Sequence, residues 1–174
     1  MRKVIIVGVA GSGKSTLAKR ISKKINARHI ELDSIYHQQN WQPIETEEFI
    51  KTINEFMEND SWVFCGNYFS RLGLEFWSKA DTVIWLDYPF HTALRRVFLR
   101  TLKRGLTRQV LWNGNRESLR KNLFTKDSVI RHMLTTWRKQ KKRYEPIFLA
   151  NKLGDTTLIK FTNDSQANEF VQSL

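Results

Sequence analysis

Residues 3–16 read KVIIVGVAGSGKST, and this stretch decides the fold of the chain. The apolar run over residues 3–7 predicts a buried strand, and Leu17, Ile21 and Ile25 predict one face of a following helix. Between them stands G-x-x-x-x-G-K-[ST], the phosphate-binding loop pattern, at residues 8–15. A strand, this loop and a helix in that order predict a site for a nucleoside triphosphate, ATP or GTP.

Each residue type of the loop has an expected role in binding a phosphate group or a metal ion. The expected nucleotide-binding set is Gly8, Gly11, Ser12, Gly13, Lys14, Ser15 and Thr16. The glycines allow the backbone to turn its N–H groups toward a polyphosphate. Lys14 offers an ammonium to the β- and γ-phosphates, and the Ser15 hydroxyl is the expected Mg²⁺ ligand. The following helix adds its positive end to the same site.

The composition indicates a single globular domain over residues 1–174. Hydrophobic residues make up 41% of the 174, enough for one full core. No apolar run approaches membrane-spanning length, so we expect no membrane partner. Cys65 is the only cysteine, which excludes an internal disulfide, and the chain starts directly with a strand. Both features favour a cytoplasmic protein.

Short apolar runs separated by helical patterns predict a parallel sheet covered on both faces. The expected strands are 3–7, 27–32, 62–65, 82–86 and 156–161. The helix that begins near Phe90 is expected to end at Gly105, because glycine is a poor helix former. We therefore predict a three-layer α/β domain with five parallel strands.

Ligands of such sheets bind beyond the carboxyl ends of the strands, where the chain places Asp33, Gly66-Asn67-Tyr68 and Asp87. Asp33 is expected to accept a hydrogen bond from an acceptor hydroxyl or to hold Mg²⁺, although a turn aspartate is the simpler alternative. Gly66, Asn67 and Tyr68 could equally contact the acceptor or form a plain turn. Asp-Tyr-Pro is a common turn composition, so a structural role is favoured for Asp87.

The excess positive charge of the chain lies in one segment. The net charge is +12, and residues 95–143 hold 16 Lys/Arg against two acids. Such a segment could grip the phosphates of a small substrate, bind nucleic acid, or form a solvated helix face. We expect Arg100 and Arg104 to bind the nucleotide, and Arg104 and Arg138 to stabilise the transferring phosphoryl group.

Four tryptophans could stack on a base. Trp77 and Trp137 fit apolar helix faces and are expected in the core. Trp41 and Trp112 are expected in loops and are the better ligand candidates.

The chain resembles the adenylate-kinase-like P-loop kinases, and most closely the bacterial DNA topology modulation proteins. The resemblance rests on five stretches and covers nearly the whole chain. They are the loop and helix start at 8–18, Leu32–Tyr36 with Trp41, Ser61–Val63 leading to Gly66-Asn67-Tyr68, Ala80–Pro89 and the arginine-rich Arg95–Arg108.

This resemblance implies a P-loop NTPase fold with strand order 2-3-1-4-5, an acceptor-binding region at 33–71 and a mobile, basic lid at 105–126. It also implies that lid arginines close on ATP. Relatives usually place an acid just before Gly-Asn-Tyr to help hold Mg²⁺, but this chain has Cys65 there. Asp33 or Asp87 would then take the metal role, or catalysis would be weakened.

The leading hypothesis is a kinase that uses ATP and Mg²⁺ to phosphorylate a small acceptor held near Asp33, Trp41, Gly66-Asn67-Tyr68 and Arg71. A nucleoside monophosphate or nucleoside is the first expectation, and shikimate-like or gluconate-like alcohols are also possible. The alternative is a nucleic-acid-associated regulator that binds ATP, with weak or no kinase activity. An inactive kinase that retains ATP binding is the third possibility.

Overall fold

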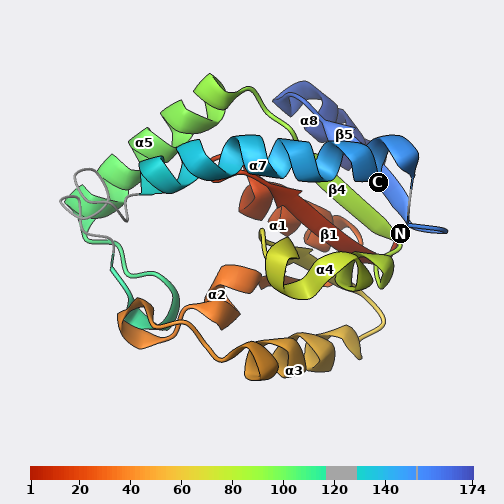
Figure 1. The fold of residues 1–174 in the computed structure, drawn as a ribbon, viewed down its shortest axis with the longest axis horizontal. Coiled ribbons are helices and arrows are strands. Elements are labelled where there is room, and N and C mark those ends of the chain that lie inside the picture. Colours follow the sequence, from red (N-terminus) through yellow and green to blue (C-terminus); the bar gives the residue numbers. More distant parts are fainter. Residues whose placement is uncertain (117–128, 152) are drawn as a thin grey trace.

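The computed structural model describes residues 1–116, 129–151 and 153–174, with only the backbone described for 129–132. Five parallel strands form one sheet, as the sequence predicts, in the order β2-β3-β1-β4-β5 that the resemblance implies (Figure 1). The strands are β1 (Lys3–Gly8), β2 (Arg28–Glu31), β3 (Trp62–Cys65), β4 (Thr82–Leu86) and β5 (Thr157–Phe161). The α-helices are α1 (Lys14–Lys24), α2 (Leu32–Tyr36), α3 (Thr46–Met57), α4 (Phe69–Ser78), α5 (Phe90–Thr107), α7 (Val129–Ala150) and α8 (Asp164–Ser173).

The two faces of the sheet bury alternate residues of each strand. Val4 and Ile6 of β1 pack in the cluster that includes α1 and α8. Ile5 and Val7 pack in the opposite cluster, which draws side chains from α3, α4 and α7. All four side chains are at most 1% exposed. Both faces of β1 are therefore covered, which explains its unbroken apolar sequence.

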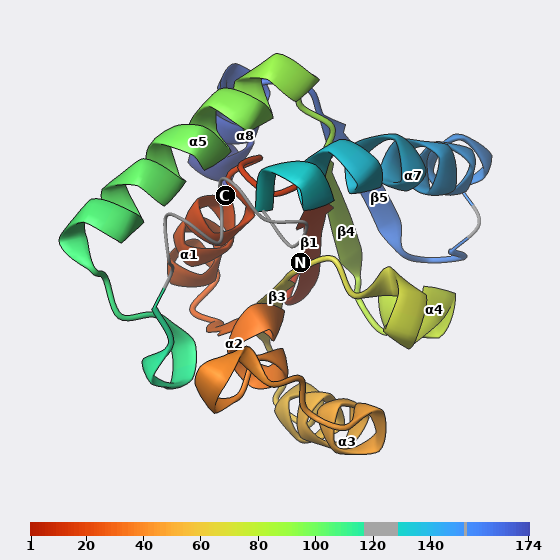
Figure 2. The same ribbon diagram turned by 60° about the vertical axis from the view of Figure 1, so that its left-hand side comes forward.

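Helices α5 and α7 lie side by side beyond the phosphate loop (Figures 1 and 2). Val9 of the loop is buried against Ala93 and Val97 of α5 and Met133 of α7. This small cluster fastens the loop to the two helices that carry most of the excess arginine and lysine.

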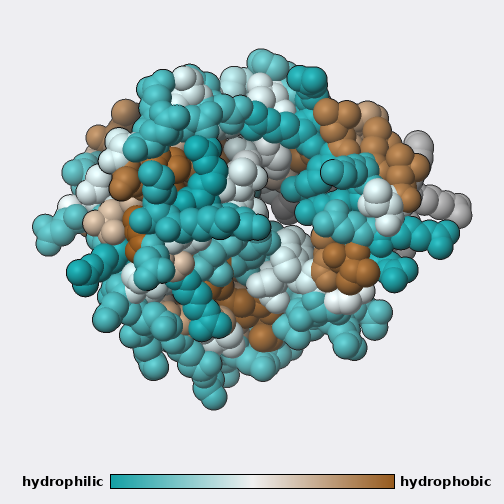
Figure 3. Space-filling view, turned by 180° about the vertical axis from the view of Figure 1, so that it is seen from behind, coloured by the Kyte–Doolittle hydropathy of each residue, from teal (hydrophilic) through white to brown (hydrophobic). Residues whose placement is uncertain are grey.

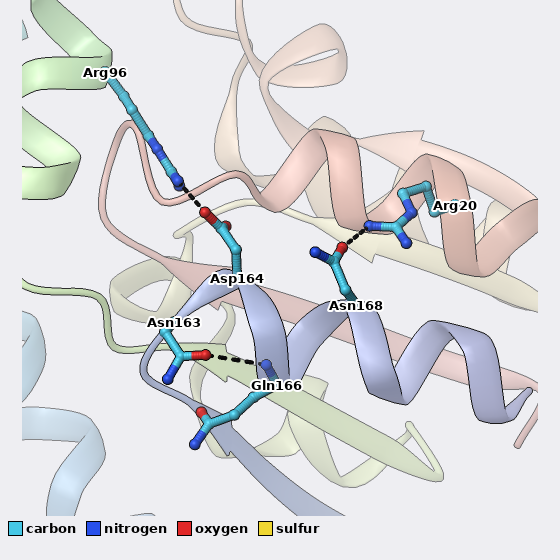
Figure 4. A network of polar contacts seen from close by, with 6 residues as sticks. All are labelled: Arg20, Arg96, Asn163, Asp164, Gln166 and Asn168. Atoms are coloured by element: carbon cyan, nitrogen blue, oxygen red, sulfur yellow. Dashed lines mark hydrogen bonds and ion pairs between the residues drawn. The ribbon is translucent and has the colours of Figure 1, made fainter.

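Helix α8 is tied to both α1 and α5 by polar contacts (Figure 4). Arg96 of α5 pairs with Asp164, and Arg20 of α1 donates to Asn168. The Oδ1 atom of Asn163 caps the helix by accepting from the N–H of Gln166 at 3.0 Å. Arg96 of α5 therefore pairs with α8 in this structure.

Two local predictions were wrong. Gly105 lies inside α5, which continues to Thr107 and ends with Arg108 in the left-handed region at φ 47°. A single glycine costs a helix only about 1 kcal/mol, which is too little to end a helix of this length. The sequence reading also missed α2, because a helix of 5 residues is too short to show a helical period.

The face seen in Figure 3 is mostly hydrophilic, and its apolar groups gather in several separate clusters. On α5, Phe98, Leu99 and Leu106 are 43%, 53% and 75% exposed. Among the described residues, no helix is long and apolar enough to cross a membrane.

Replacing Phe64 by Ala tests the packing of the sheet. Phe64 is fully buried on β3 between Trp62 and Phe76, so we expect the free energy of unfolding to fall by about 3–5 kcal/mol in urea titrations. Phe98→Ala, on the exposed side of α5, is the matched control and should cost about 0.5 kcal/mol. Equal losses from the two variants would contradict the assignment of the core.

Candidate active site

The phosphate loop is held in shape by its own backbone conformation and hydrogen bonds. Gly13 has φ 93° where the loop joins α1, a conformation that favours glycine. The Ser12 N–H donates to the Val9 carbonyl at 3.2 Å, and the Lys14 ammonium donates to the same carbonyl at 2.8 Å. The ammonium is thus held over the loop, where the phosphates of a nucleotide would lie.

Several charged and polar groups surround Lys14. Burial lowers the pKa of its ammonium to about 8, while Asp33 and Glu31 oppose this shift and Arg100 adds to it. An ammonium with such a pKa is only weakly compensated by the protein. It therefore has most to gain from an anionic ligand such as a polyphosphate.

Asn67 braces the start of the loop. Its Oδ1 accepts from the Gly8 N–H at 3.0 Å, and its amide nitrogen donates to the Gly8 carbonyl. Gly66 is required by packing, because a Cβ there would lie 2.8 Å from the Cβ of Leu32. Gly66 and Asn67 thus form a turn that supports the phosphate loop, which is the simpler of the two alternatives for these residues.

Asp33 and Tyr68 come together from different elements. Asp33 lies in the first turn of α2, and the Tyr68 hydroxyl donates to its Oδ1 at 2.7 Å. Burial raises the pKa of the Tyr68 hydroxyl, and the Asp33 charge raises it further, so the phenol stays protonated. Its ring packs against Tyr36 and Phe49. Among the described residues, the structure gives no other hydrogen bond to the Asp33 carboxylate.

Arg71 lies at the edge of the same region. Its guanidinium donates to the Thr46 and Tyr36 hydroxyls, at 2.7 Å each, and stacks over the Tyr36 ring at 4.9 Å. These contacts fix the direction of an exposed arginine. A fixed guanidinium suits the planar recognition of a carboxylate.

Glu31 is the acid that the sequence analysis missed. Glu31 is the last residue of β2, and its negative charge raises the pKa of both Lys14 and Cys65. The Cys65 thiol lies 3.9 Å from the Ser15 hydroxyl, and burial raises its pKa to about 12, so it is neutral. Glu31 therefore supplies the carboxylate beside Ser15. The signal available was the Glu31-x-Asp33 spacing at the end of a strand.

Oxygen ligands beside Ser15 fit Mg²⁺, which prefers one or two carboxylates plus phosphate oxygens and waters. Glu31 and Ser15 both line a cavity of about 330 Å³. Asp87 does not fit this role, although it was one of the two replacements considered for the missing acid. It is 8% exposed and pairs with Lys160 at 2.9 Å and Lys141 at 3.6 Å.

The loop at residues 111–116 docks on the segment from β2 to the 3₁₀ turn η1 (Gln39–Trp41). Trp112, in the turn η2 (Trp112–Gly114), donates its indole N–H to Glu31 at 2.9 Å. Asn115 accepts from the Trp41 N–H at 2.8 Å and donates to the Gln38 carbonyl at 2.8 Å. Both candidate base-stacking tryptophans are thus engaged in joining these loops. Residues 117–126 of the expected lid lie outside the described residues.

The candidate arginines are not equivalent. Arg100 is close enough to Lys14 to depress its pKa, which places it at the nucleotide side of the site. Arg104 lies one turn further along α5, and Arg138 is exposed on α7. Trp77 is buried, as predicted.

Comparisons with known proteins give one consistent family. The shikimate kinase family matches residues 10–149. The shikimate kinase of Persephonella marina is 28% identical over 148 residues, covering 72% of this chain and 81% of that protein. That of Flavobacterium psychrophilum is 33% identical over 64 residues, a match that spans only 37% of this chain and 32% of its relative.

Solved structures share the fold. The shikimate kinase of Bacteroides thetaiotaomicron aligns with a TM-score of 0.59 and 14% identity, covering 98% of this chain and 94% of that one. The Acinetobacter baumannii enzyme, solved in complex with shikimate, aligns with a TM-score of 0.59 and 15% identity over 99% and 90% of the two chains. These matches do not support the more specific of the two resemblances, the one to the DNA topology modulation proteins.

With residues 10–149 inside the family match and solved members sharing the fold, the chain belongs to the shikimate kinase family of P-loop phosphotransferases, which use ATP with Mg²⁺.

Proposed function

We propose that the chain transfers the γ-phosphoryl group of ATP to a hydroxyl of a small hydroxycarboxylic acid, with shikimate as the first acceptor to test. The observation that carries this proposal is the position of Asp33. Its carboxylate accepts a hydrogen bond from Tyr68, and its charge is close enough to Lys14 to raise the pKa of that ammonium. A carboxylate there lies between the phosphate loop and the acceptor region 33–71.

In this mechanism, Asp33 accepts the proton of the acceptor hydroxyl as its oxygen attacks the γ-phosphorus, and ADP leaves. Tyr68 positions Asp33 by occupying one carboxylate oxygen. Lys14 and the loop N–H groups stabilise the phosphate oxygens. Ser15, with Glu31 close by, would hold Mg²⁺, which would neutralise part of the phosphate charge.

The charges of the acceptor region favour a singly charged acid over a nucleotide. Residues 33–71 contain seven acids and two bases, Lys51 and Arg71. Arg71 suits one carboxylate, and the net negative charge of this stretch disfavours the doubly charged phosphate of a nucleoside monophosphate more than a singly charged acid. The nucleotide-like acceptor expected at first is therefore replaced by a hydroxy acid. This choice also agrees with the shikimate bound in the Acinetobacter baumannii relative.

The remaining roles are proposals too. Arg100 and Arg104 would contact the nucleotide from α5, and Arg138 would approach from α7. Residues 105–126 would act as the lid that excludes water from the reaction. The basic surface of α5 and α7 would then serve phosphates, and no observation in the structure favours nucleic acid.

A panel of acceptors tests the proposed reaction. We expect ATP consumption with shikimate and little with AMP, a nucleoside or no acceptor, because Arg71 selects a carboxylate and Asp33 a nearby hydroxyl. Lys14→Ala is the inactive control. Turnover with a nucleotide but not with any hydroxy acid would overturn the assignment of the acceptor.

Variants of Asp33 and Arg71 separate chemistry from binding. Asp33→Asn should lower kcat by at least about a hundredfold, because the base is lost. Arg71→Ala should raise the KM for the acceptor by about tenfold or more and leave the KM for ATP unchanged. Lys51→Ala, an exposed cation on α3, is the control and should change neither. If Arg71→Ala and Lys51→Ala behaved alike, the carboxylate contact would be refuted.

The pH dependence of ATP binding tests the state of Lys14. The pKa of Lys14 is about 8 in the free protein, so the ammonium loses its proton above that pH. ATP binds the charged form, and its Kd should therefore rise from about pH 8 upward, approaching tenfold per unit. Lys14→Met should bind ATP weakly at every pH without this rise. The same slope in both proteins would show that another group is responsible.

A further inference from the structure

A second kind of metal ligand set lies beside the proposed Mg²⁺ position. His29 and Glu31 of β2 and Cys65 of β3 each offer one ligand atom, and these three atoms lie within 4.8 Å of one another. The parallel register of β2 and β3 creates this cluster, because it pairs Glu31 directly with Cys65. His29 lies two residues before Glu31 and so faces the same side of the sheet.

The spacing of the cluster suits a tetrahedral ion. His29 Nε2 lies 3.4 Å from Cys65 Sγ. Zinc bonds of about 2.3 Å to sulfur and about 2.0 Å to nitrogen, at a tetrahedral angle, separate these atoms by about 3.5 Å. The Ser15 hydroxyl, 3.9 Å from the same sulfur, stands next to the remaining position. Little rearrangement is therefore needed for His29 and Cys65 to meet one ion, and Glu31 offers an oxygen within 4.8 Å of both.

The surroundings of the cluster also resemble those of a metal site. The Trp112 indole donates to Glu31 at 2.9 Å, which orients the carboxylate while leaving lone pairs for an ion. His29 and Glu31 line two cavities, of about 330 and 480 Å³, so an ion can reach them from solvent. The linings also contain cations that oppose the binding of a metal ion: Lys19 in both, Arg28 in one, and Arg20 and Lys23 in the other.

We propose that His29, Glu31 and Cys65 form a binding site for a thiophilic divalent ion such as Zn²⁺, and that its occupation inhibits phosphoryl transfer. Sulfur and imidazole ligands favour Zn²⁺ strongly over Mg²⁺, which prefers oxygen. On binding, the Cys65 thiol releases its proton to solvent and the thiolate coordinates the ion. The ion withdraws Glu31 from the Mg²⁺ position and crowds Ser15. The inhibition, unlike the binding, rests on the proposed function.

Cobalt tests the site directly, with the full chain and no nucleotide. Co²⁺ bound to thiolate gives a near-ultraviolet charge-transfer band, and Cys65 is the only cysteine that can produce it. We expect the band to saturate at one Co²⁺ per chain, and Zn²⁺ to abolish it by competition. Cys65→Ser should remove the band, and His29→Asn should weaken binding by at least about tenfold. His91→Asn, exposed on α5, is the matched control.

A titration without a saturating band, or with equal affinity in His29→Asn and His91→Asn, would overturn the site. Inhibition is measured separately, each variant against its own zinc-free rate. Zn²⁺ should inhibit the wild type at a concentration at least about tenfold lower than it inhibits His29→Asn. Equal sensitivity would overturn the inhibitory role. The cobalt titration needs neither ATP nor acceptor, so it stands whatever acceptor the enzyme uses.

Discussion

The half-buried ammonium of Lys14 is the constraint on which the rest of the site depends. A cation there, bonded to the Val9 carbonyl at 2.8 Å, requires anionic neighbours, and the end of β2 and the first turn of α2 supply them as Glu31 and Asp33. The pKa of about 8 shows that these neighbours do not compensate burial fully. The site is therefore ready for the further negative charge of a polyphosphate, and Asn67 keeps the loop in place by bonding Gly8.

Much of the fold could be predicted from the sequence because it is encoded locally. The strand positions and the three layers can be predicted from local patterns, namely the apolar strands, the glycine-lysine-serine loop and the helical periods. The strand order came from a resemblance, since crossover geometry leaves no local pattern. The helix end predicted at Gly105 was wrong, although its signal was also local. A single glycine costs a helix about 1 kcal/mol, and packing along α5 outweighed this cost.

Residues of the site could be predicted only where the local motif that contains a residue also indicates what that residue binds. The phosphate loop satisfies this condition, and Asp33 was recognised from its place after a strand. Glu31 was missed because its relation to Ser15 and Cys65 arises from the pairing of β2 with β3, two strands far apart in the sequence. The docking of Trp112 on Glu31, across 81 residues, is equally invisible to spacing arguments.

The central claim is that Asp33 receives the reacting hydroxyl of a hydroxy acid opposite Lys14. The most direct measurement is a crystal structure of the protein with ADP, Mg²⁺ and shikimate. The account predicts one shikimate hydroxyl within about 3 Å of Asp33 on the side facing the phosphate loop, with the carboxylate at Arg71. Shikimate bound elsewhere, or bound in this region with its carboxylate toward Asp33, would contradict the account.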